Sequence, residues 1–285
     1  MSTPKVSIII PTYHDWKRLA ICLDGLEKQT FPTEDFEILV VNNDPKDQVP
    51  DNFYLPQNCV LLNEGKPGSY SARNAALKLV KGEIIGFTDS DCIPDKDWIK
   101  NAVDFLNNNQ KYSRIAGNIV LFYQSNKLTF AELYEKRYAF KQDFAASLGI
   151  GITGNMFTYK HVFDKVGHFN DNLLSSGDNE WWLRANKEGY LISFGENIII
   201  NHPARHEMSE LMKKAKRLAG HIGDNKLKAI VRFLKYSIPP LNALIPKYGL
   251  SLKEAFIVFF IRYYLNINRY LEELSISFGK KANRE

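Results

Sequence analysis

The stretch EIIGFTDSDC, residues 83–92, decides the fold. A run of apolar and β-branched residues ends in a polar cluster that carries two carboxylates, Asp89 and Asp91. Residues two apart in extended backbone project to the same side, about 6–7 Å from each other. Such a pair suits a metal ion, but Asp and Ser are also common where any strand enters a loop. The stretch predicts a buried strand and, by itself, leaves the use of its carboxylates open.

The same pattern occurs earlier in the chain. The apolar run of residues 5–10 leads into PTYHD, and residues 36–41 lead into NND. The segments between these runs have helical spacing, so the pattern predicts βαβ units, that is, an α/β fold with a mostly parallel sheet and helices on both faces. Because ligands of such sheets bind beyond the carboxyl ends of the strands, we expect the polar clusters to form one site.

Further elements follow from hydrophobic periodicity. We expect a strand at residues 59–63, a helix near 71–80, a helix from about Asp95 to 108, and a strand at 114–123. One long amphipathic helix is expected at 128–144. A helix closed by Gly189 and a strand pair or bent strand at 191–202 should follow. Beyond Ala204 the pattern is almost wholly helical, with a break at 239–249.

Size and composition indicate a soluble, globular protein. The chain has 285 residues, of which 45% are hydrophobic, enough for one large domain and an appendage. The three cysteines, Cys22, Cys59 and Cys92, form no C-x-x-C pair, so they suggest neither a disulfide framework nor a zinc site, and a reducing cytoplasm fits best. The N-terminus lacks the features of a signal peptide and is expected to be the first strand.

The charge is distributed unevenly. Residues 1–204 carry 21 Lys and Arg against 25 Asp and Glu, whereas residues 205–285 carry 16 against 7. A basic region of this kind faces a lipid surface or a nucleic acid, or is a set of solvated helix faces. The run at 255–267 is largely apolar but too short to span a bilayer, so we expect an interfacial helix or one packed on the core. We therefore predict two domains, 1–205 and 206–285.

The first predicted loop lacks the glycines of nucleotide-binding motifs. PTYHDWKR, residues 11–18, contains neither G-x-G-x-x-G nor G-x-x-x-x-G-K-[ST]. If the ligand has a diphosphate, a divalent cation held by carboxylates would have to neutralise it.

Four ordered motifs, carried by three segments of the chain, resemble one family. Residues 6–44, 71–98 and 153–190 together are similar to family 2 glycosyltransferases with the GT-A fold, and the resemblance extends to about Arg205. It implies a metal-dependent, inverting transfer of a sugar from a nucleotide-diphosphate donor to a hydroxyl acceptor. The cofactor would be Mn²⁺ or Mg²⁺, and a UDP-sugar is the expected donor.

The resemblance also implies roles for residues on the donor side. Pro11, Thr12 and Tyr13 would line the nucleobase pocket, with Tyr13 stacking on the base. The alternative is that Tyr13 is an ordinary aromatic residue that closes the end of the strand. Asn43 stands where the family often has a base-binding aspartate, which puts the base identity in doubt. Three further positions match the donor segments: Arg73 facing the diphosphate, or else a surface arginine, and Gly154 and Asn155 near the sugar.

For the metal and the acceptor, the same matching selects four residues. Asp89 would contact the ribose or sugar, Asp91 would be the main metal ligand, and His202 would complete the metal shell or be a structural histidine. Asp178 matches the aspartate that deprotonates the acceptor, and it also suits a helix cap. Gly177 departs from the family, which often has Glu there.

The expected function is that of a hexosyltransferase-type enzyme in the synthesis of cell-surface polysaccharide or glycolipid. The acceptor would be a glycan or a lipid-linked glycan, and the protein would be cytoplasmic and peripheral at the inner face of the membrane. A membrane surface is a candidate partner through the C-terminal region, and no nucleic acid is expected. Two rivals are a nucleotidyltransferase acting on sugar phosphates and a non-catalytic scaffold that binds nucleotide-sugars.

Overall fold

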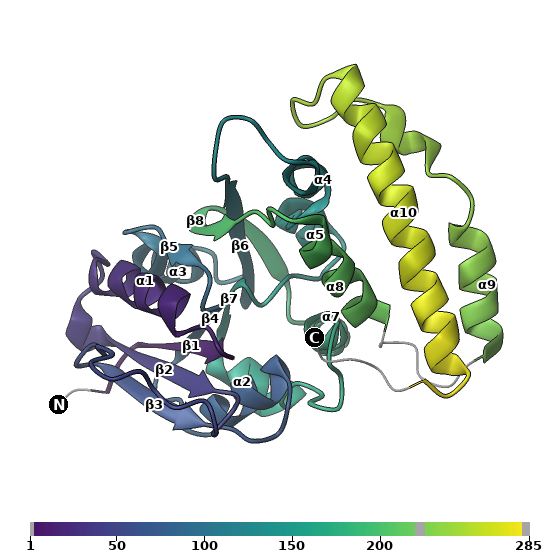
Figure 1. The fold of residues 1–285 in the computed structure, drawn as a ribbon. Helices are drawn as coiled ribbons and strands as arrows, with labels where there is room; N and C mark the ends of the chain where they lie inside the picture. The colour runs from purple at the N-terminus through teal and green to yellow at the C-terminus, as the bar shows by residue number, and fades with distance from the viewer. Residues whose placement is uncertain (1–2, 220–225, 281–285) are drawn as a thin grey trace. The chain divides into compact units, whose positions relative to one another are not determined.

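The computed structural model of the chain describes residues 3–219 and 226–280 and has an α/β fold (Figure 1). Its strands form one eight-stranded sheet in the order β3-β2-β1-β4-β7-β6-β8-β5. The strands β1 (Val6–Thr12), β2 (Phe36–Asn42), β3 (Cys59–Asn63) and β4 (Ile84–Thr88) pair in parallel. Strand β7 (Asn155–Tyr159) continues the sheet antiparallel to β4. The mostly parallel sheet predicted from the sequence is confirmed.

Alternating side chains of the central strands serve two cores. Ile8 and Ile10 of β1 pack with α1 (Trp16–Glu27) and α3 (Trp98–Asn108) on one face of the sheet. Ile9 packs on the other face with α2 (Ser69–Leu77) and α7 (Gly177–Lys187). Because both faces are covered, β1 and β2 are buried at every position, which is why they are mostly apolar, and the buried hydroxyl of Ser7 donates to the carboxylate of Glu37.

The remaining elements complete the chain. They are η1 (Thr33–Asp35), β5 (Ile93–Pro94), β6 (Arg114–Phe122), α4 (Phe130–Tyr138), α5 (Gln142–Ser147), α6 (Lys160–Val166), β8 (Ile192–Pro203), α8 (Met208–Ala219), α9 (Lys226–Tyr236), η2 (Leu241–Leu244) and α10 (Leu252–Ser277).

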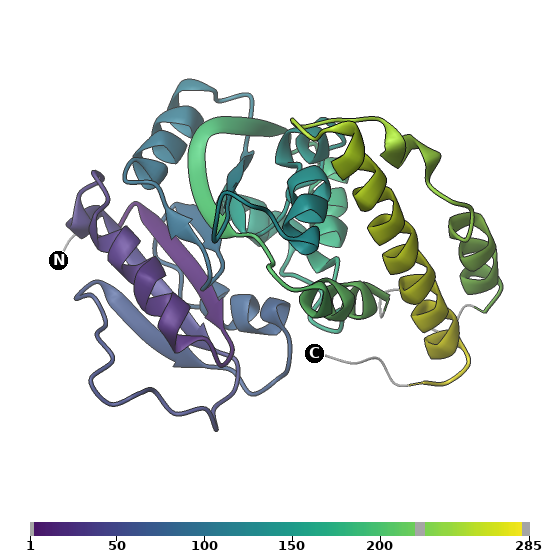
Figure 2. The ribbon, with the colours of Figure 1, turned by 45° about the horizontal axis from the view of Figure 1, so that its top comes forward.

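The chain divides into two compact units. The first, here called the catalytic unit, comprises residues 1–120, 140–173 and 177–202, and the second, the helical unit, comprises 121–139, 174–176 and 203–285. Within the helical unit, α10 packs against α8, α9, η2 and α4, and Figure 2 shows α9 and α10 side by side. The helical C-terminal region is confirmed, and α4 from the middle of the chain joins it.

One predicted element is wrong. The expected helix over 128–144 is two helices, α4 and α5, because Ala139 after α4 is extended, with a ψ of 143°, and Phe140 adopts a positive φ of 48°. Both conformations lie outside the right-handed helical region, so the helix ends despite continuing apolar periodicity. Strand β8 is one long strand of 12 residues. In the described part of the chain, every helix is too short or too polar to cross a membrane.

Candidate active site

Polar side chains gather at the carboxyl ends of three neighbouring strands of the catalytic unit. Thr12 ends β1, Asn42 ends β2 and Thr88 ends β4, with Asn43 and Asp89 directly following. Because these strands are parallel and adjacent, their ends lie at one edge of the sheet, as the sequence predicts.

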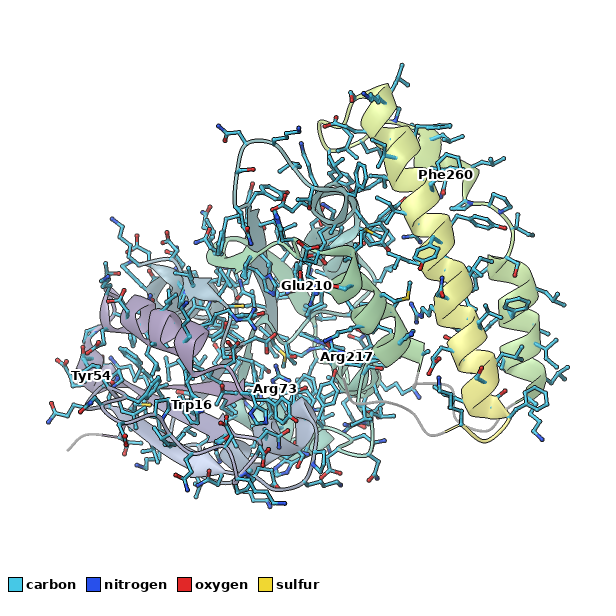
Figure 3. All side chains as sticks on the ribbon, in the orientation of Figure 1. Trp16, Tyr54, Arg73, Glu210, Arg217 and Phe260 are labelled. Atoms are coloured by element: carbon cyan, nitrogen blue, oxygen red, sulfur yellow. The ribbon has the colours of Figure 1, made fainter. Side chains whose placement is uncertain are left out.

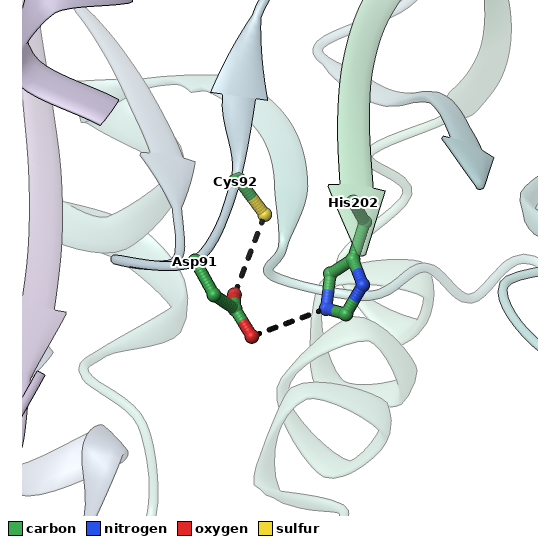
Figure 4. A group of neighbouring side chains, drawn as sticks. All are labelled: Asp91, Cys92 and His202. Carbon is green, nitrogen blue, oxygen red and sulfur yellow. Dashed lines mark hydrogen bonds and ion pairs between the residues drawn. The ribbon is translucent and has the colours of Figure 1, made fainter. Parts of the chain in front are cut away.

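The carboxylate of Asp91 faces the imidazole of His202. Asp91 Oδ2 lies 3.4 Å from His202 Nε2, and Cys92 Sγ lies 3.8 Å from Asp91 Oδ1 (Figure 4). His202 is buried, and its ring packs against Phe140 with the centroids 4.5 Å apart. Antiparallel pairing of β5 with β8 brings these segments together, because Ile93 stands opposite Asn201.

These side chains fit a hard divalent cation. Ligand atoms of Asp91, Cys92 and His202 all lie within 4.8 Å of one another. Burial, followed by the charges of Asp91 and Asp89, raises the pKa of the Cys92 thiol well above its ordinary value, and sulfur is a softer ligand than Mn²⁺ or Mg²⁺ prefers. The remaining carboxylate and imidazole suit Mn²⁺ or Mg²⁺ when diphosphate and water oxygens complete the shell.

Buried Arg73 forms an ion pair with partly exposed Asp89. The guanidinium Nη2 of Arg73 donates to Asp89 Oδ1, and Arg73, labelled in Figure 3, is only 2% exposed. Its Nε is buried and has no hydrogen-bond partner among the described residues. A buried cation with an unused donor is a site for an anionic ligand such as a diphosphate.

Asp178 lies on α7 within reach of Tyr70. The Tyr70 hydroxyl donates to Asp178 Oδ1 at 3.1 Å, and the Asn179 backbone N–H donates to the same oxygen at 2.9 Å. Burial raises the pKa of Asp178 above the ordinary aspartate value, and the opposing influences include these hydrogen bonds and the charge of Arg73. A desolvated carboxylate with a raised pKa is a better proton acceptor.

Two glycines permit this close packing. A Cβ at Gly177 would stand 2.7 Å from the Tyr70 ring, so a side chain such as the family's Glu does not fit with Tyr70 as placed. A Cβ at Gly154 would lie 3.3 Å from Asp89 Oδ2, which puts the Gly154 backbone against the same carboxylate that Arg73 binds.

On the nucleotide side, the side chain of Asn43 organises a loop. Its Nδ2 donates to the carbonyls of Glu64 and Lys66, and its Oδ1 accepts from Gly68 N–H at 2.8 Å. Pro11 and Thr12 are buried, and Thr12 Oγ1 has no partner among the described residues.

Comparison with known proteins gives the family of the chain. Residues 7–168 match glycosyl transferase family 2. The chain belongs to this family. It is 32% identical over 221 residues to glycosyltransferase AglE of Haloferax volcanii, a match that covers 75% of this chain and 72% of AglE.

Solved structures show the same fold. The mannosyltransferase PcManGT from Pyrobaculum calidifontis, in complex with GDP-Man and Mn²⁺, aligns with a TM-score of 0.58 and 18% identity, covering 99% of this chain and 77% of that one. S. aureus TarS 1–349 in complex with UDP-GlcNAc aligns with a TM-score of 0.53 and 17% identity, covering 96% and 90%. This family 2 glycosyltransferase therefore has the GT-A fold.

Not every predicted site residue joins the group in this glycosyltransferase. Asn155 is fully buried, its Oδ1 accepts from Trp98 Nε1, and its amide donates to the carbonyls of Asn118 and Ile198. Its side chain therefore links strands of the core, and we leave it out of the donor site. Trp181 and Trp182 are also fully buried, so neither is available to stack on a sugar.

Two contacts of the site were missed in the sequence. Tyr70 stands three residues before Arg73 on α2, so both side chains lie on adjoining positions of one helix face, and the guanidinium lies 5.9 Å from the Tyr70 ring centroid. Arg18 of α1 lies 3.6 Å from Asp91 Oδ2. Helix spacing could have indicated the contact of Tyr70 with Arg73. The contact of Arg18 with Asp91 depends on how α1 packs on the sheet, which the sequence does not give.

Proposed function

We propose that this glycosyltransferase transfers a hexose, with inversion and with the help of a divalent cation, from a nucleotide-diphosphate donor to a hydroxyl group. The acceptor in this proposal is a glycan or a lipid-linked glycan used for cell-surface polysaccharide or glycolipid. We propose a UDP-sugar as the first donor to test, although the solved relatives hold GDP-Man in one case and UDP-GlcNAc in another.

One observation carries the proposal: a series of side-chain contacts leads from Asp89, which is close in sequence to the candidate metal ligand, to the candidate base. Asp89, two residues before Asp91, pairs with Arg73. Arg73 lies over the ring of Tyr70, whose hydroxyl bonds to Asp178. A cation-binding carboxylate, a buried arginine for phosphate and a desolvated carboxylate base are the groups that displacement from a nucleoside diphosphate needs.

In the proposed reaction, the acceptor hydroxyl gives its proton to Asp178 as its oxygen bonds to the anomeric carbon. The bond between that carbon and the diphosphate oxygen breaks, and the electron pair leaves with the nucleoside diphosphate. Arg73 would bind the diphosphate through its unused Nε donor while Asp89 holds the guanidinium and a hydroxyl of the donor. Pro11, Thr12 and Tyr13 would hold the base.

Asp91 and His202 are the residues that would hold the cation. When bound, Mn²⁺ or Mg²⁺ would offset the negative charge that builds on the leaving diphosphate. Arg18, close to Asp91, would keep that carboxylate in place before the donor arrives. We place the reaction in the cytoplasm, where three free cysteines are compatible with a reducing environment.

The test is a panel of UDP- and GDP-sugars with and without Mn²⁺, read by thermal shift and by release of nucleoside diphosphate. We expect one donor to stabilise the protein only when Mn²⁺ is present. In Asp91→Asn, adding Mn²⁺ should no longer increase the stabilisation by that donor. Asp104→Asn, at a surface carboxylate that pairs with Lys100, is the matched control. Donor stabilisation that is indifferent to Mn²⁺ would contradict the metal-dependent mechanism.

The two rivals make different predictions in the same panel. A nucleotidyltransferase would release pyrophosphate from nucleoside triphosphate and sugar phosphate, and a scaffold would bind donor without releasing nucleoside diphosphate. The retained pair of Asp91 and Asp178 favours the transferase over both.

A further inference from the structure

Helix α10 of the helical unit exposes an apolar stripe along its length. The side chains of Leu252, Phe256, Phe260, Tyr264 and Leu271 are exposed, and so is that of Phe278, which directly follows the last residue of the helix. Steps of four and seven residues keep them on one side of the helix, and Figure 3 labels Phe260 among them. At about 1.5 Å per residue, the 26-residue helix is about 40 Å long.

The opposite side of α10 is already packed. Val258, Ile261 and Leu265 are buried, the last two in a cluster with residues of α4 and α8. The helix α9 lies against a second side, where Tyr236 stacks on Tyr270 with ring centroids 4.3 Å apart. The stripe therefore is a third face, which no described element covers.

The charged residues of α10 beyond Lys253 avoid the stripe. The guanidinium of Arg262, which interrupts the apolar run in the sequence, lies 4.1 Å from the ring centroid of Tyr138 on α4. Arg269 turns towards the buried carboxylate of Glu273 at 3.7 Å. The apolar stripe is thus continuous on the surface, although Arg262 interrupts the apolar run in the sequence.

Basic residues are concentrated in the segment that precedes α10 and packs against it. The segment from Lys226 to Lys253, which contains α9 and η2, has six Lys and Arg and no Asp or Glu. The same segment exposes Leu227, Val231 and Leu234 on α9. More than half of the exposed large hydrophobic side chains in the described part of the chain lie between Lys226 and Phe278.

We propose that the α9–α10 face, defined as the exposed apolar side chains of α9 and the stripe of α10 together with the lysines of 226–253, docks on an anionic lipid surface. Exposed aromatic and aliphatic side chains would enter the boundary between head groups and acyl chains, and the lysines would contact the anionic head groups. The helix would lie on the membrane, because no described helix is able to cross it.

The charge distribution selects a lipid surface over a second copy of the chain. Two copies joined face to face would bring together two stretches, residues 226–278, that each carry eight Lys and Arg against three Glu, and the excess of positive charge opposes association. An anionic bilayer instead provides both an apolar phase for the stripe and counter-charges for the lysines. The inference does not depend on the sugar transfer, since it concerns the helical unit only.

The test is flotation of the full chain with vesicles, without any nucleotide-sugar. One set contains phosphatidylcholine and phosphatidylglycerol, and the other contains phosphatidylcholine alone. We expect the chain to float with the anionic vesicles and to be released by high salt. Phe256→Ser combined with Phe260→Ser should lower the partition coefficient at least about tenfold, because two phenyl side chains lose their burial in lipid.

Two matched controls distinguish binding through this surface from non-specific adsorption to vesicles. Phe144→Ser combined with Leu148→Ser removes two equally exposed apolar side chains of the catalytic unit and should leave flotation unchanged. Lys235→Glu combined with Lys253→Glu should weaken binding to anionic vesicles but not to vesicles of phosphatidylcholine alone. Lys165→Glu combined with Lys187→Glu should leave binding to both kinds of vesicle unchanged.

Three results would overturn the proposal. They are failure of the chain to float with either vesicle, equal flotation of the double Phe variant and the parent chain, and a dimer in light scattering that the double Phe variant dissociates. Because the substituted side chains are more than half exposed, circular dichroism should show the variants folded, so loss of flotation reports on the surface.

Discussion

The sheet edge of the catalytic unit and the outer face of α10 depart from the usual distribution of residues in opposite directions. At the sheet edge, polar and charged groups are buried, including Arg73 at 2% exposure and His202 at 5%. On α10, large apolar groups such as Phe256 and Phe260 are more than half exposed. Burial of the polar groups costs folding free energy unless they are paired, whereas the exposed apolar side chains mark a surface for interaction.

The difference between the two regions lies in how the departure is stabilised. Charged side chains of the site have specific partners, as in the pairs of Arg73 with Asp89 and of Tyr70 with Asp178, although Thr12 Oγ1 and Arg73 Nε have none among the described residues. The stripe on α10 has no such network and depends on its neighbours on the packed side. We therefore expect substitutions at the sheet edge to change chemistry, and substitutions on the stripe to change partition between water and lipid without changing the fold.

The largest expected effect is at Asp178. Asp178→Asn removes the proton acceptor while keeping the size of the side chain, so we expect the rate of transfer to fall about 10²- to 10⁴-fold. Donor binding, measured by thermal shift with Mn²⁺, should be retained. Asp164→Asn, at an exposed carboxylate of α6, is the control and should keep full activity. Loss of donor binding in Asp178→Asn would instead make Asp178 a structural residue.

Gly177 tests how tightly the site is packed. In Gly177→Ala, the new Cβ would meet the Tyr70 ring at 2.7 Å, and relieving that overlap should cost about 1–3 kcal/mol in the free energy of unfolding. Because Tyr70 also bonds to Asp178, activity should fall together with stability. Gly65→Ala, where the new Cβ would lie 3.8 Å from Pro45 Cγ, is the control in chemical denaturation. Unchanged stability in Gly177→Ala would show that Tyr70 moves freely.

The strands around the site were predictable because they are buried on both faces. β1, β2 and β4 are mostly apolar and do not alternate regularly between apolar and polar residues, so each is recognised as a buried strand. The polar residues that end these strands identify the edge of the sheet where a ligand would bind. Asp89, Asp91 and Arg73 were selected from the sequence, and the structure brings Arg73 and Asp89 into contact. Their roles in binding and catalysis stay predictions.

What the sequence could not predict depends on contacts between distant segments. Asn155 looked like a ligand group, but its amide is used by carbonyls 37 and 43 residues away in the chain. The break at Phe140 is a backbone conformation that hydrophobic periodicity does not encode. Likewise, the continuity of the α10 stripe depends on where Arg262 points, and Tyr138 on another helix decides that.

The two sides of α10 offer an internal comparison. Val258→Ala removes two methyl groups from a fully buried position and should lower the free energy of unfolding by about 2 kcal/mol. Phe260→Ser, two residues later but on the exposed stripe, should change it by less than about 0.5 kcal/mol. Urea denaturation of both variants gives the comparison. A large loss in Phe260→Ser would mean that the stripe packs against protein rather than facing solvent.

The smallest expected effect is a shift in the pH profile when Tyr70 loses its hydroxyl. Burial raises the pKa of Asp178, and the Tyr70 hydrogen bond opposes that rise, so Tyr70→Phe should raise the pKa further. Since the base acts in its unprotonated form, activity is present above this pKa and is lost as pH falls through it. The acid limb of kcat/KM should therefore move to higher pH, with little change on the plateau.

A matched variant distinguishes this positioning role from simple loss of a tyrosine hydroxyl. Tyr54→Phe also removes a hydroxyl that donates to a carboxylate, that of Glu27 at 2.8 Å, but on an exposed surface. Its acid limb should coincide with that of the parent enzyme. The same raised pKa makes folding less favourable as pH rises from the ordinary aspartate range through the pKa of Asp178, so Asp178→Asn should flatten that part of the stability profile. An acid limb that stays in place in Tyr70→Phe would separate Tyr70 from the base and leave it only a packing role beneath Arg73.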